Sequence, residues 1–185
     1  MKKIFLCIIT FIIILITINW KKILKQVYKT SYSNYVEQYS EENGVDPLMV
    51  YAIIKAESNF NEGATSRKGA LGLMQLMDNT AKEVAENSTV DYVSGETLYN
   101  PEKNIMLGIK YYSTLKAELK NDGLALAAYN AGIGNVKIWI ETGILKNDGS
   151  NIENIPYKET NMYVRKILKD YKIYKALYEN KQTEK

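Results

Sequence analysis

The sequence predicts an all-α protein in which a single globular domain follows an N-terminal transmembrane helix. Apolar residues recur at helical spacing in several segments, and asparagine, glycine or proline bounds most of these segments. No stretch alternates apolar and polar residues over a useful strand length, and no internal repeat is evident. With 46% hydrophobic residues among 185, the chain can bury the core of one domain.

The N-terminal segment is the candidate membrane helix. Residues 4–18 contain no charge, lysines flank this run on both sides, and Trp20 lies at its end. The 17 residues of the segment 4–20 are near the shortest apolar length that spans a bilayer. Because no small-x-small cleavage motif follows, we expect residues 1–22 to form an uncleaved signal anchor. Lysines at both ends mean that charge alone does not set its orientation.

The rest of the chain divides into a connector, a domain and a tail. We expect a polar and basic connector, which could form a helix, over residues 23–33, the domain over residues 34–178 and a frayed tail over residues 179–185. The first helix of the domain, residues 34–43, carries tyrosine and valine on one side and glutamates on the other. Gly44 then ends it.

The second helix of the domain is expected to be buried. Residues 47–57 are apolar around almost the whole circumference, Asp46 suits the N-cap, and Pro47 suits the first helical position. A polar loop over residues 59–68 then leads away. After a glycine-interrupted stretch, residues 77–86 are expected to be helical.

Four further helices complete the predicted domain. A long helix over residues 101–120 begins with an asparagine cap and a proline, and a compact apolar helix over residues 123–130 follows it. A glycine-containing turn leads into a helix over residues 135–141. The last helix, residues 162–178, is amphipathic and rich in lysine and tyrosine.

Glu57 is the candidate catalytic acid, because it ends the buried helix. Its carboxylate lies above Ile53 and Ile54, at a helix C-terminus that carries partial negative charge. Apolar neighbours and negative charge both disfavour the anion, so both raise the pKa of this carboxyl group. A glutamic acid that is protonated near neutral pH can protonate a glycosidic oxygen. The same position also suits a glutamate that reaches solvent or pairs with a lysine.

The composition excludes several other chemistries. The chain has no histidine, and its only cysteine, Cys7, lies in the N-terminal apolar run. Catalytic triads with histidine, Cys–His pairs and zinc sites with histidine or cysteine ligands are therefore excluded, and we expect no metal and no cofactor. Apart from the four lysines that flank the run, 20 basic residues stand against 21 acidic ones. This near-neutral body does not suggest nucleic-acid binding.

Four polar motifs follow one another in a characteristic order. They are Glu57-Ser58; Ala64-Thr-Ser66 with Gly69-Ala-Leu-Gly-Leu-Met-Gln75; Ala128-Tyr-Asn-Ala-Gly132; and Ile155-Pro-Tyr-Lys-Glu-Thr160 with Tyr163-Val164. Taken singly, Gln75 could satisfy backbone groups, Tyr129 could pack in the core and Glu159 could be solvated. Taken together, the motifs resemble those of the soluble-lytic-transglycosylase (SLT) catalytic domain, family 1, over residues 35–178.

The resemblance implies a lysozyme-like α fold with a cleft for the glycan strands of peptidoglycan. It makes Glu57 the single acid/base that cleaves the β-1,4 bond between N-acetylmuramic acid and N-acetylglucosamine, with the muramoyl 6-hydroxyl attacking to leave a 1,6-anhydro end. The motif positions that would line the cleft or support the acid are Ser66, Met74, Gln75, Tyr129, Asn130, Glu159 and Tyr163. A peptidoglycan substrate would place the domain, expected to be monomeric, on the extracytoplasmic side of the cell membrane.

Two alternatives stay open at this stage. A muramidase of goose-lysozyme type would share the general fold but deliver water to the anomeric carbon, positioned by Glu159 or a loop carboxylate. A non-catalytic cell-wall-binding module would use some of the 15 tyrosines to stack on sugar rings, although the usual role of such side chains is core packing.

Overall fold

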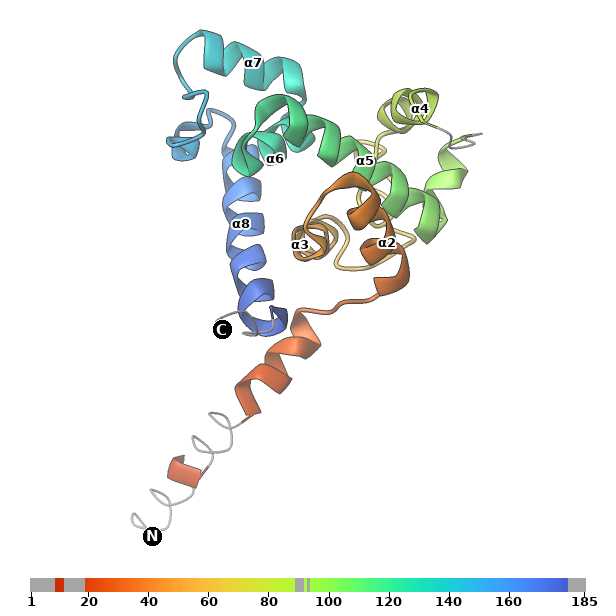
Figure 1. Cartoon of the computed structure of the whole chain (residues 1–185), viewed down its shortest axis with the longest axis vertical. Helices are drawn as coiled ribbons and strands as arrows, with labels where there is room; N and C mark the ends of the chain where they lie inside the picture. Colours follow the sequence, from red (N-terminus) through yellow and green to blue (C-terminus); the bar gives the residue numbers. More distant parts are fainter. Residues whose placement is uncertain (1–8, 12–18, 89–91, 93, 180–185) are drawn as a thin grey trace.

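Helices form nearly all the regular structure of the described residues, which are 9–11, 19–88, 92 and 94–179 of this computed structural model (Figure 1). The labelled α-helices are α2 (Ser33–Asn43), α3 (Pro47–Glu57), α4 (Asp78–Glu86), α5 (Pro101–Leu119), α6 (Asp122–Ala131), α7 (Ile133–Glu141) and α8 (Lys158–Tyr178). Two 3-10 helices, η1 (Gly95–Tyr99) and η2 (Ile152–Asn154), lie between the segments for which the sequence predicted helices. The all-α prediction is confirmed for this part of the chain.

Side-chain caps set where several helices begin. The carboxylate of Asp46 accepts a hydrogen bond from the Leu48 amide at 2.8 Å, and Pro47 follows at the first position of α3. Asn100 caps α5 and Asn121 caps α6 in the same way, at 3.1 and 3.0 Å. The predicted starts of these helices are therefore correct to within one residue.

The last helix begins four residues earlier than the sequence predicted. The amide of Asn161 already donates to the carbonyl of Tyr157 at 2.8 Å, so α8 starts directly after this extended residue. Pro156 restricts the residue before it and does not prevent a helix from starting two residues later. Glu159 thus lies in the first turn of α8, one turn before Tyr163 and on the same face.

The buried helix α3 lies in the middle of the body, packed against α8 and α2 (Figure 1). Val50, Ala52, Ile53 and Ile54 have no exposed surface, and Met49 is only 2% exposed. This burial on all sides confirms the prediction from the sequence. It also fixes the position of the residue at the C-terminal end of the helix.

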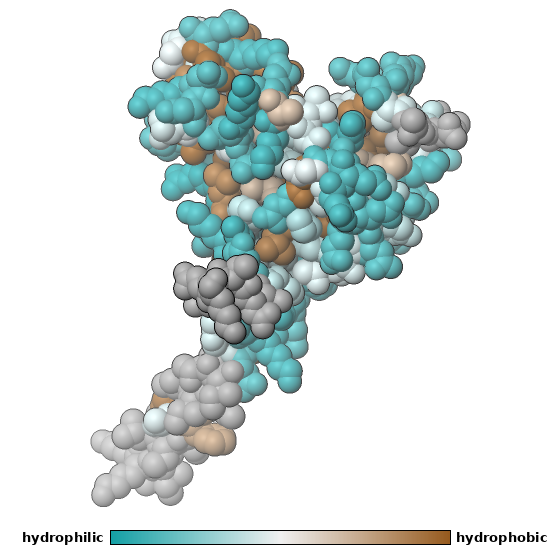
Figure 2. All heavy atoms as spheres, viewed as in Figure 1, coloured by the Kyte–Doolittle hydropathy of each residue, from teal (hydrophilic) through white to brown (hydrophobic). Residues whose placement is uncertain are grey.

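A second, smaller apolar cluster lies between α4 and α5. Its buried members are Leu76, Ala81, Ala85, Leu98 and Leu107. Figure 1 shows α4 and α7 on opposite sides of the molecule, and Figure 2 shows a hollow in the surface between them. The segment 58–76 connects the end of α3 to this second cluster.

The predicted transmembrane segment, residues 4–20, lies mostly outside the described residues. Among residues 9–11, 19–88, 92 and 94–179, no helix has both the length and the apolar character needed to cross a membrane. Residues 19–27 form a helix that leads away from the body (Figure 1). Of the predicted tail, only Glu179 is described.

Candidate active site

Glu57 is the last residue of α3, and the chain turns away immediately after it. The hydroxyl of Ser58 donates to the carbonyl of Leu73 at 2.8 Å, which ties the end of α3 to the segment 58–76. Asn59 and Phe60 follow with positive φ angles of 51° and 66°, a left-handed conformation that reverses the chain. The carboxylate is therefore presented at the point where the buried helix meets the loop.

The carboxyl group of Glu57 accepts a hydrogen bond from the hydroxyl of Tyr163 at 2.6 Å. Burial raises the pKa of Glu57 from 4.5 to about 7, because the surrounding protein excludes water from the charged form. The Tyr163 hydrogen bond and the positive charge of Lys166 lower this pKa, but they offset only part of the effect of burial. Near neutral pH, the group is thus available in both protonation states.

Tyr129 holds the loop from the side of α6. Its hydroxyl donates to the carbonyl of Met74 at 2.8 Å, and its ring lies 5.1 Å from that of Tyr111. Burial and the nearby charge of Glu57 raise the pKa of Tyr129 well above its ordinary value, and the same two causes raise that of Tyr163. Both phenols therefore remain protonated donors.

A buried asparagine that the sequence analysis missed holds the loop in place. Asn104 on α5 has no exposed surface, and its side-chain oxygen accepts the amide of Met74 at 2.7 Å. Its side-chain nitrogen donates to the carbonyls of Leu71 and Leu98 at 3.0 and 2.9 Å. An asparagine within the apolar face of a predicted helix was the available signal, because a buried amide requires such partners.

Two glycines allow the loop to approach α5 closely. A Cβ atom at Gly108 would lie 2.4 Å from the sulfur of Met74, and one at Gly72 would lie 2.3 Å from the side-chain nitrogen of Asn104 on α5. Gly72 also has a φ of 74°, in the left-handed region. Met74 is fully buried by this packing, so its backbone carbonyl, rather than its side chain, faces Tyr129.

Gln75 and Ser66 form contacts within the loop. Gln75 has a φ of 48°, and its side-chain nitrogen donates to the carbonyls of Gly72 and Ala64 at 2.8 and 3.1 Å. The hydroxyl of Ser66 accepts the amide of Ala70 at 2.9 Å. Both side chains thus shape the segment that faces Glu57.

Asn130 and Glu159 lie on the α6 and α8 side. The side-chain oxygen of Asn130 accepts the hydroxyl of Thr160 at 2.7 Å, which joins the end of α6 to the first turn of α8. Glu159 lies 3.7 Å from the ammonium of Lys68, and these side chains are 77% and 81% exposed. Such an exposed pair contributes little to stability.

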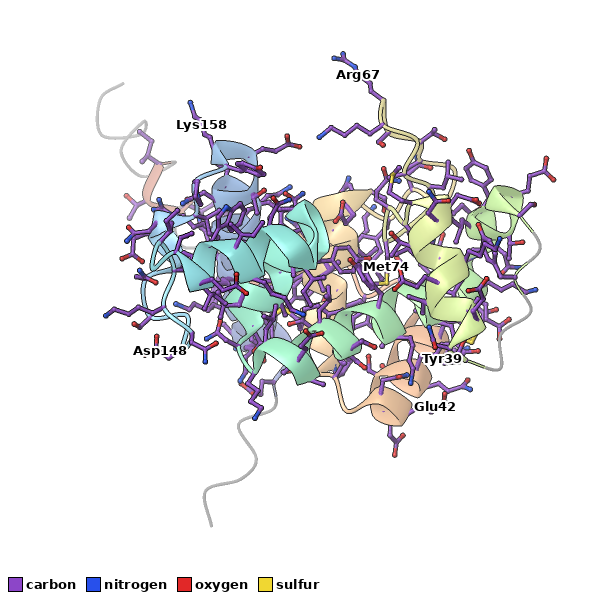
Figure 3. The ribbon with its side chains drawn as sticks, turned by 90° about the horizontal axis from the view of Figure 1, so that it is seen from above. Tyr39, Glu42, Arg67, Met74, Asp148 and Lys158 are labelled. Carbon is purple, nitrogen blue, oxygen red and sulfur yellow. The ribbon has the colours of Figure 1, made fainter. Side chains whose placement is uncertain are left out.

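The structure therefore brings Glu57, Tyr129, Tyr163 and the backbone of Met74 into one cluster. The other predicted residues contact groups of the loop, α6 and α8 instead: Ser66, Gln75, Asn130 and Glu159. Seen from above, Arg67 and Lys158 point to the same side of the molecule from the loop and from the start of α8 (Figure 3). Met74 lies between the helices in the same view. Among the described residues, no group of three or more acidic or cysteine side chains could hold a metal ion.

In this helical domain, a largely buried carboxylic acid accepts a hydrogen bond from a tyrosine. A clear family match accompanies this arrangement. The profile of the transglycosylase SLT domain matches residues 34–149, so the chain belongs to this family. Glu159 and Tyr163 lie beyond the matched residues.

Particular relatives come from both structures and sequences. The 70 kDa soluble lytic transglycosylase of Escherichia coli aligns with a TM-score of 0.75 and 30% identity, over 83% of this chain and 25% of that one. An inactive glutamate-to-glutamine mutant of the lytic transglycosylase Slt from Pseudomonas aeruginosa aligns with a TM-score of 0.73 and 32% identity, over the same shares. These likenesses confirm the predicted lysozyme-like SLT architecture.

Curated sequences give the same family in two settings. The soluble lytic murein transglycosylase of Salmonella typhimurium is 32% identical over 148 residues, which are 78% of this chain and 23% of that protein. The membrane-bound lytic murein transglycosylase C of Edwardsiella ictaluri is 38% identical over 115 residues, which are 57% of this chain and 32% of that protein. The chain thus spans roughly a quarter to a third of the length of these relatives.

Proposed function

We propose that this chain is a peptidoglycan lytic transglycosylase that cleaves the β-1,4 bond between N-acetylmuramic acid and N-acetylglucosamine, with Glu57 as the single general acid/base. The observation that carries the proposal is the environment of Glu57, whose pKa is about 7 and whose carboxyl group accepts the Tyr163 hydroxyl. The family and the names of the relatives support the class of substrate.

In the first step, protonated Glu57 gives its proton to the oxygen that leaves with N-acetylglucosamine while the bond from that oxygen to the muramoyl anomeric carbon breaks. A carboxylic acid with a pKa near the working pH is well matched to this transfer. The carboxylate that forms keeps the hydrogen bond from Tyr163, which stabilises the charged state. Tyr129 holds the loop beside it through the Met74 carbonyl.

In the second step, the Glu57 carboxylate takes the proton of the muramoyl 6-hydroxyl. The 6-oxygen bonds to the anomeric carbon and closes the 1,6-anhydro ring, so no water is consumed and the acid is regenerated. Most glycosidases need a second carboxylate, whereas the groups that perturb Glu57 in the described chain are a tyrosine and a lysine. A substrate that supplies its own nucleophile suits a site of this composition.

The remaining site residues are proposed to act on the substrate from the two sides of Glu57. Ser66, Met74 and Gln75 would contribute from the loop, whose backbone is held by the side chains of Ser66 and Gln75 and, at Met74, by Asn104. Asn130 and Glu159 would contribute from the α6 and α8 side. The domain is proposed to act as a monomer, without metal or cofactor.

Digestion of purified peptidoglycan by the detergent-solubilised full chain, followed by mass spectrometry, tests the reaction. We expect 1,6-anhydromuramic ends and no incorporation of oxygen from labelled water. Reducing muramic ends carrying labelled oxygen would instead identify a hydrolytic muramidase of goose-lysozyme type. Glu57→Gln should abolish cleavage in a folded protein, and binding without cleavage by the unmodified chain would identify a non-catalytic wall-binding module.

We further propose that residues 1–22 anchor the chain in the cell membrane by a single pass, with the domain on the wall side. The uncharged run at residues 4–18 supports this location, as does the similarity to a membrane-bound relative. Protease added to wall-free cells should degrade the domain. Complete protection of the domain in intact wall-free cells would contradict the proposed topology.

A further inference from the structure

The segment before α2 packs against the body, although the sequence predicted only a connector there. Tyr28 belongs to the main core and is 8% exposed. Two hydroxyls of α8 hold its backbone: Tyr178 donates to the carbonyl of Tyr28 at 2.6 Å, and Tyr174 donates to that of Lys29 at 2.8 Å. The chain therefore leaves the body along a fixed path, through a segment that we call the N-terminal strut (residues 19–32).

A buried ion pair joins the strut to the catalytic helix. The hydroxyl of Tyr28 donates to one carboxylate oxygen of Asp170 at 2.9 Å, and the ammonium of Lys55 lies 2.9 Å from the other. The same ammonium lies 4.5 Å from the centre of the Tyr28 ring. Lys55 is two residues before Glu57 on α3, so the strut is coupled to the helix that presents the acid.

The outer part of the strut is a helix with one exposed apolar face. Trp20, Ile23 and Val27 are 44%, 48% and 55% exposed, and their spacing of three and four residues places them on the same side. Figure 1 shows this helix leading away from the body beyond the end of α8. The lysines of the helix, Lys21, Lys22 and Lys25, lie on its other faces.

We infer that this apolar face lies in the headgroup region of an anionic lipid bilayer, so that the strut holds the domain against the membrane in one orientation. The inference rests on the proposed membrane attachment. An aromatic and aliphatic stripe beside several lysines is complementary to a surface that is apolar within and negatively charged outside. The uncharged run at residues 4–18 has 15 residues, fewer than the roughly 20 that span a bilayer, and the stripe extends its apolar surface.

Lipid fits the stripe better than a second copy of this chain. Two copies joined along Trp20, Ile23 and Val27 would cover the stripe, but they would offer no negative charge to the lysines on the other faces of the helix. Anionic headgroups neutralise the same lysines and leave room for their long side chains to reach the polar region. The cleft would then lie at a fixed height above the membrane rather than on a flexible tether.

A pair of labelled variants tests the contact, because Cys7 is the only cysteine in the chain. In a Cys7→Ala background, the variants Ile23→Cys and Lys22→Cys are each labelled with an environment-sensitive fluorophore. The two labelled positions are adjacent along the helix axis but lie on different faces of the helix. The full chain is reconstituted into vesicles of phosphatidylglycerol and phosphatidylcholine, with iodide on both sides. We expect a doxyl-labelled lipid to quench the probe at position 23 several-fold more strongly, and iodide to quench the probe at position 22 more strongly.

Equal quenching of the two positions by iodide would overturn the inference. A position 23 signal that rises with the protein-to-lipid ratio would identify a second copy as the partner, which would also overturn it. Neither readout requires glycan cleavage, so a failure here is distinct from a failure of the proposed reaction.

Rigidity of the strut has its own test. Tyr174→Phe with Tyr178→Phe removes the two hydroxyls that hold the strut backbone, and fluorescence anisotropy of a probe at position 23 should fall. The control is Tyr157→Phe, because Tyr157 is half-exposed and its hydroxyl lies 3.5 Å from Asn135, away from the strut. Unchanged anisotropy in the double variant would refute a fixed orientation.

Discussion

The hydrogen bond from Tyr163 to Glu57 leads to a prediction about pH dependence. Tyr163→Phe removes the donor while keeping the ring. Because this bond lowers the pKa of Glu57, its loss should raise that pKa above its present value of about 7. The protonated acid would then persist to higher pH, and the alkaline limb of the activity profile should move upward.

The size of the shift follows from the strength of the bond. A hydrogen bond to a charged group contributes about 1.5–3 kcal/mol, and one pKa unit corresponds to about 1.4 kcal/mol. The full loss would therefore raise the pKa by roughly 1–2 units. Glu57 is not completely enclosed, so water can replace part of the lost bond, and we expect a shift of about 1 unit.

The assay is the pH dependence of kcat/KM on purified peptidoglycan, which reports the pKa of the free enzyme. Tyr171→Phe is the matched control, because it removes a 2.6 Å hydrogen bond to Asp46 from the same helix without touching Glu57. We expect the control to lose stability and keep the alkaline limb of the unmodified enzyme. If Tyr163→Phe also leaves that limb in place, Glu57 does not govern it.

Three further predictions concern stability. Burial raises the pKa of Glu57 from 4.5 to about 7, so the stabilising contribution of this group is complete below pH 4.5 and is lost as the pH rises through 7. In urea unfolding, Glu57→Gln should therefore be about 1–3 kcal/mol more stable than the unmodified chain at pH 8. At pH 4 the two proteins should have similar stability. Asn104→Leu leaves three buried backbone groups without their hydrogen-bond partner and should lower the free energy of unfolding by about 3 kcal/mol or more. An unchanged urea midpoint would contradict this account of the loop. Lys55→Met should cost about 3–5 kcal/mol by leaving Asp170 charged and buried, and adding Asp170→Leu should restore much of the loss in thermal unfolding.

The sequence predicted the buried helix and its terminal acid because both depend on local patterns. Helix caps, proline position and all-round apolarity are readable along the chain, and α3 begins and ends where these signals place it. The raised pKa of Glu57 was also predicted, and burial is its main cause. Tyr163 was expected near the site only from a family resemblance, since 106 residues separate it from Glu57.

Features that depend on long-range packing were not predicted. The position of Asn104 on an apolar helix face hints at burial, but its three partners come from segments that only the fold brings together. The connector was expected to be polar and basic, yet Tyr28 packs in the core against residues near the end of the chain. A tyrosine in a basic stretch carries no signal for such a contact.

The structure suggests why the site can keep an acid that is costly to ionise. The end of α3 is held from three directions: the Ser58 hydroxyl binds the loop, Tyr163 of α8 binds the carboxylate, and the Lys55–Asp170 pair fixes the preceding turn. Moving Glu57 into bulk water to relieve its desolvation would break at least one of these contacts. The packing therefore maintains the raised pKa of Glu57. A substitution in the strut that loosens Lys55 should weaken catalysis, even though the strut lies outside the site.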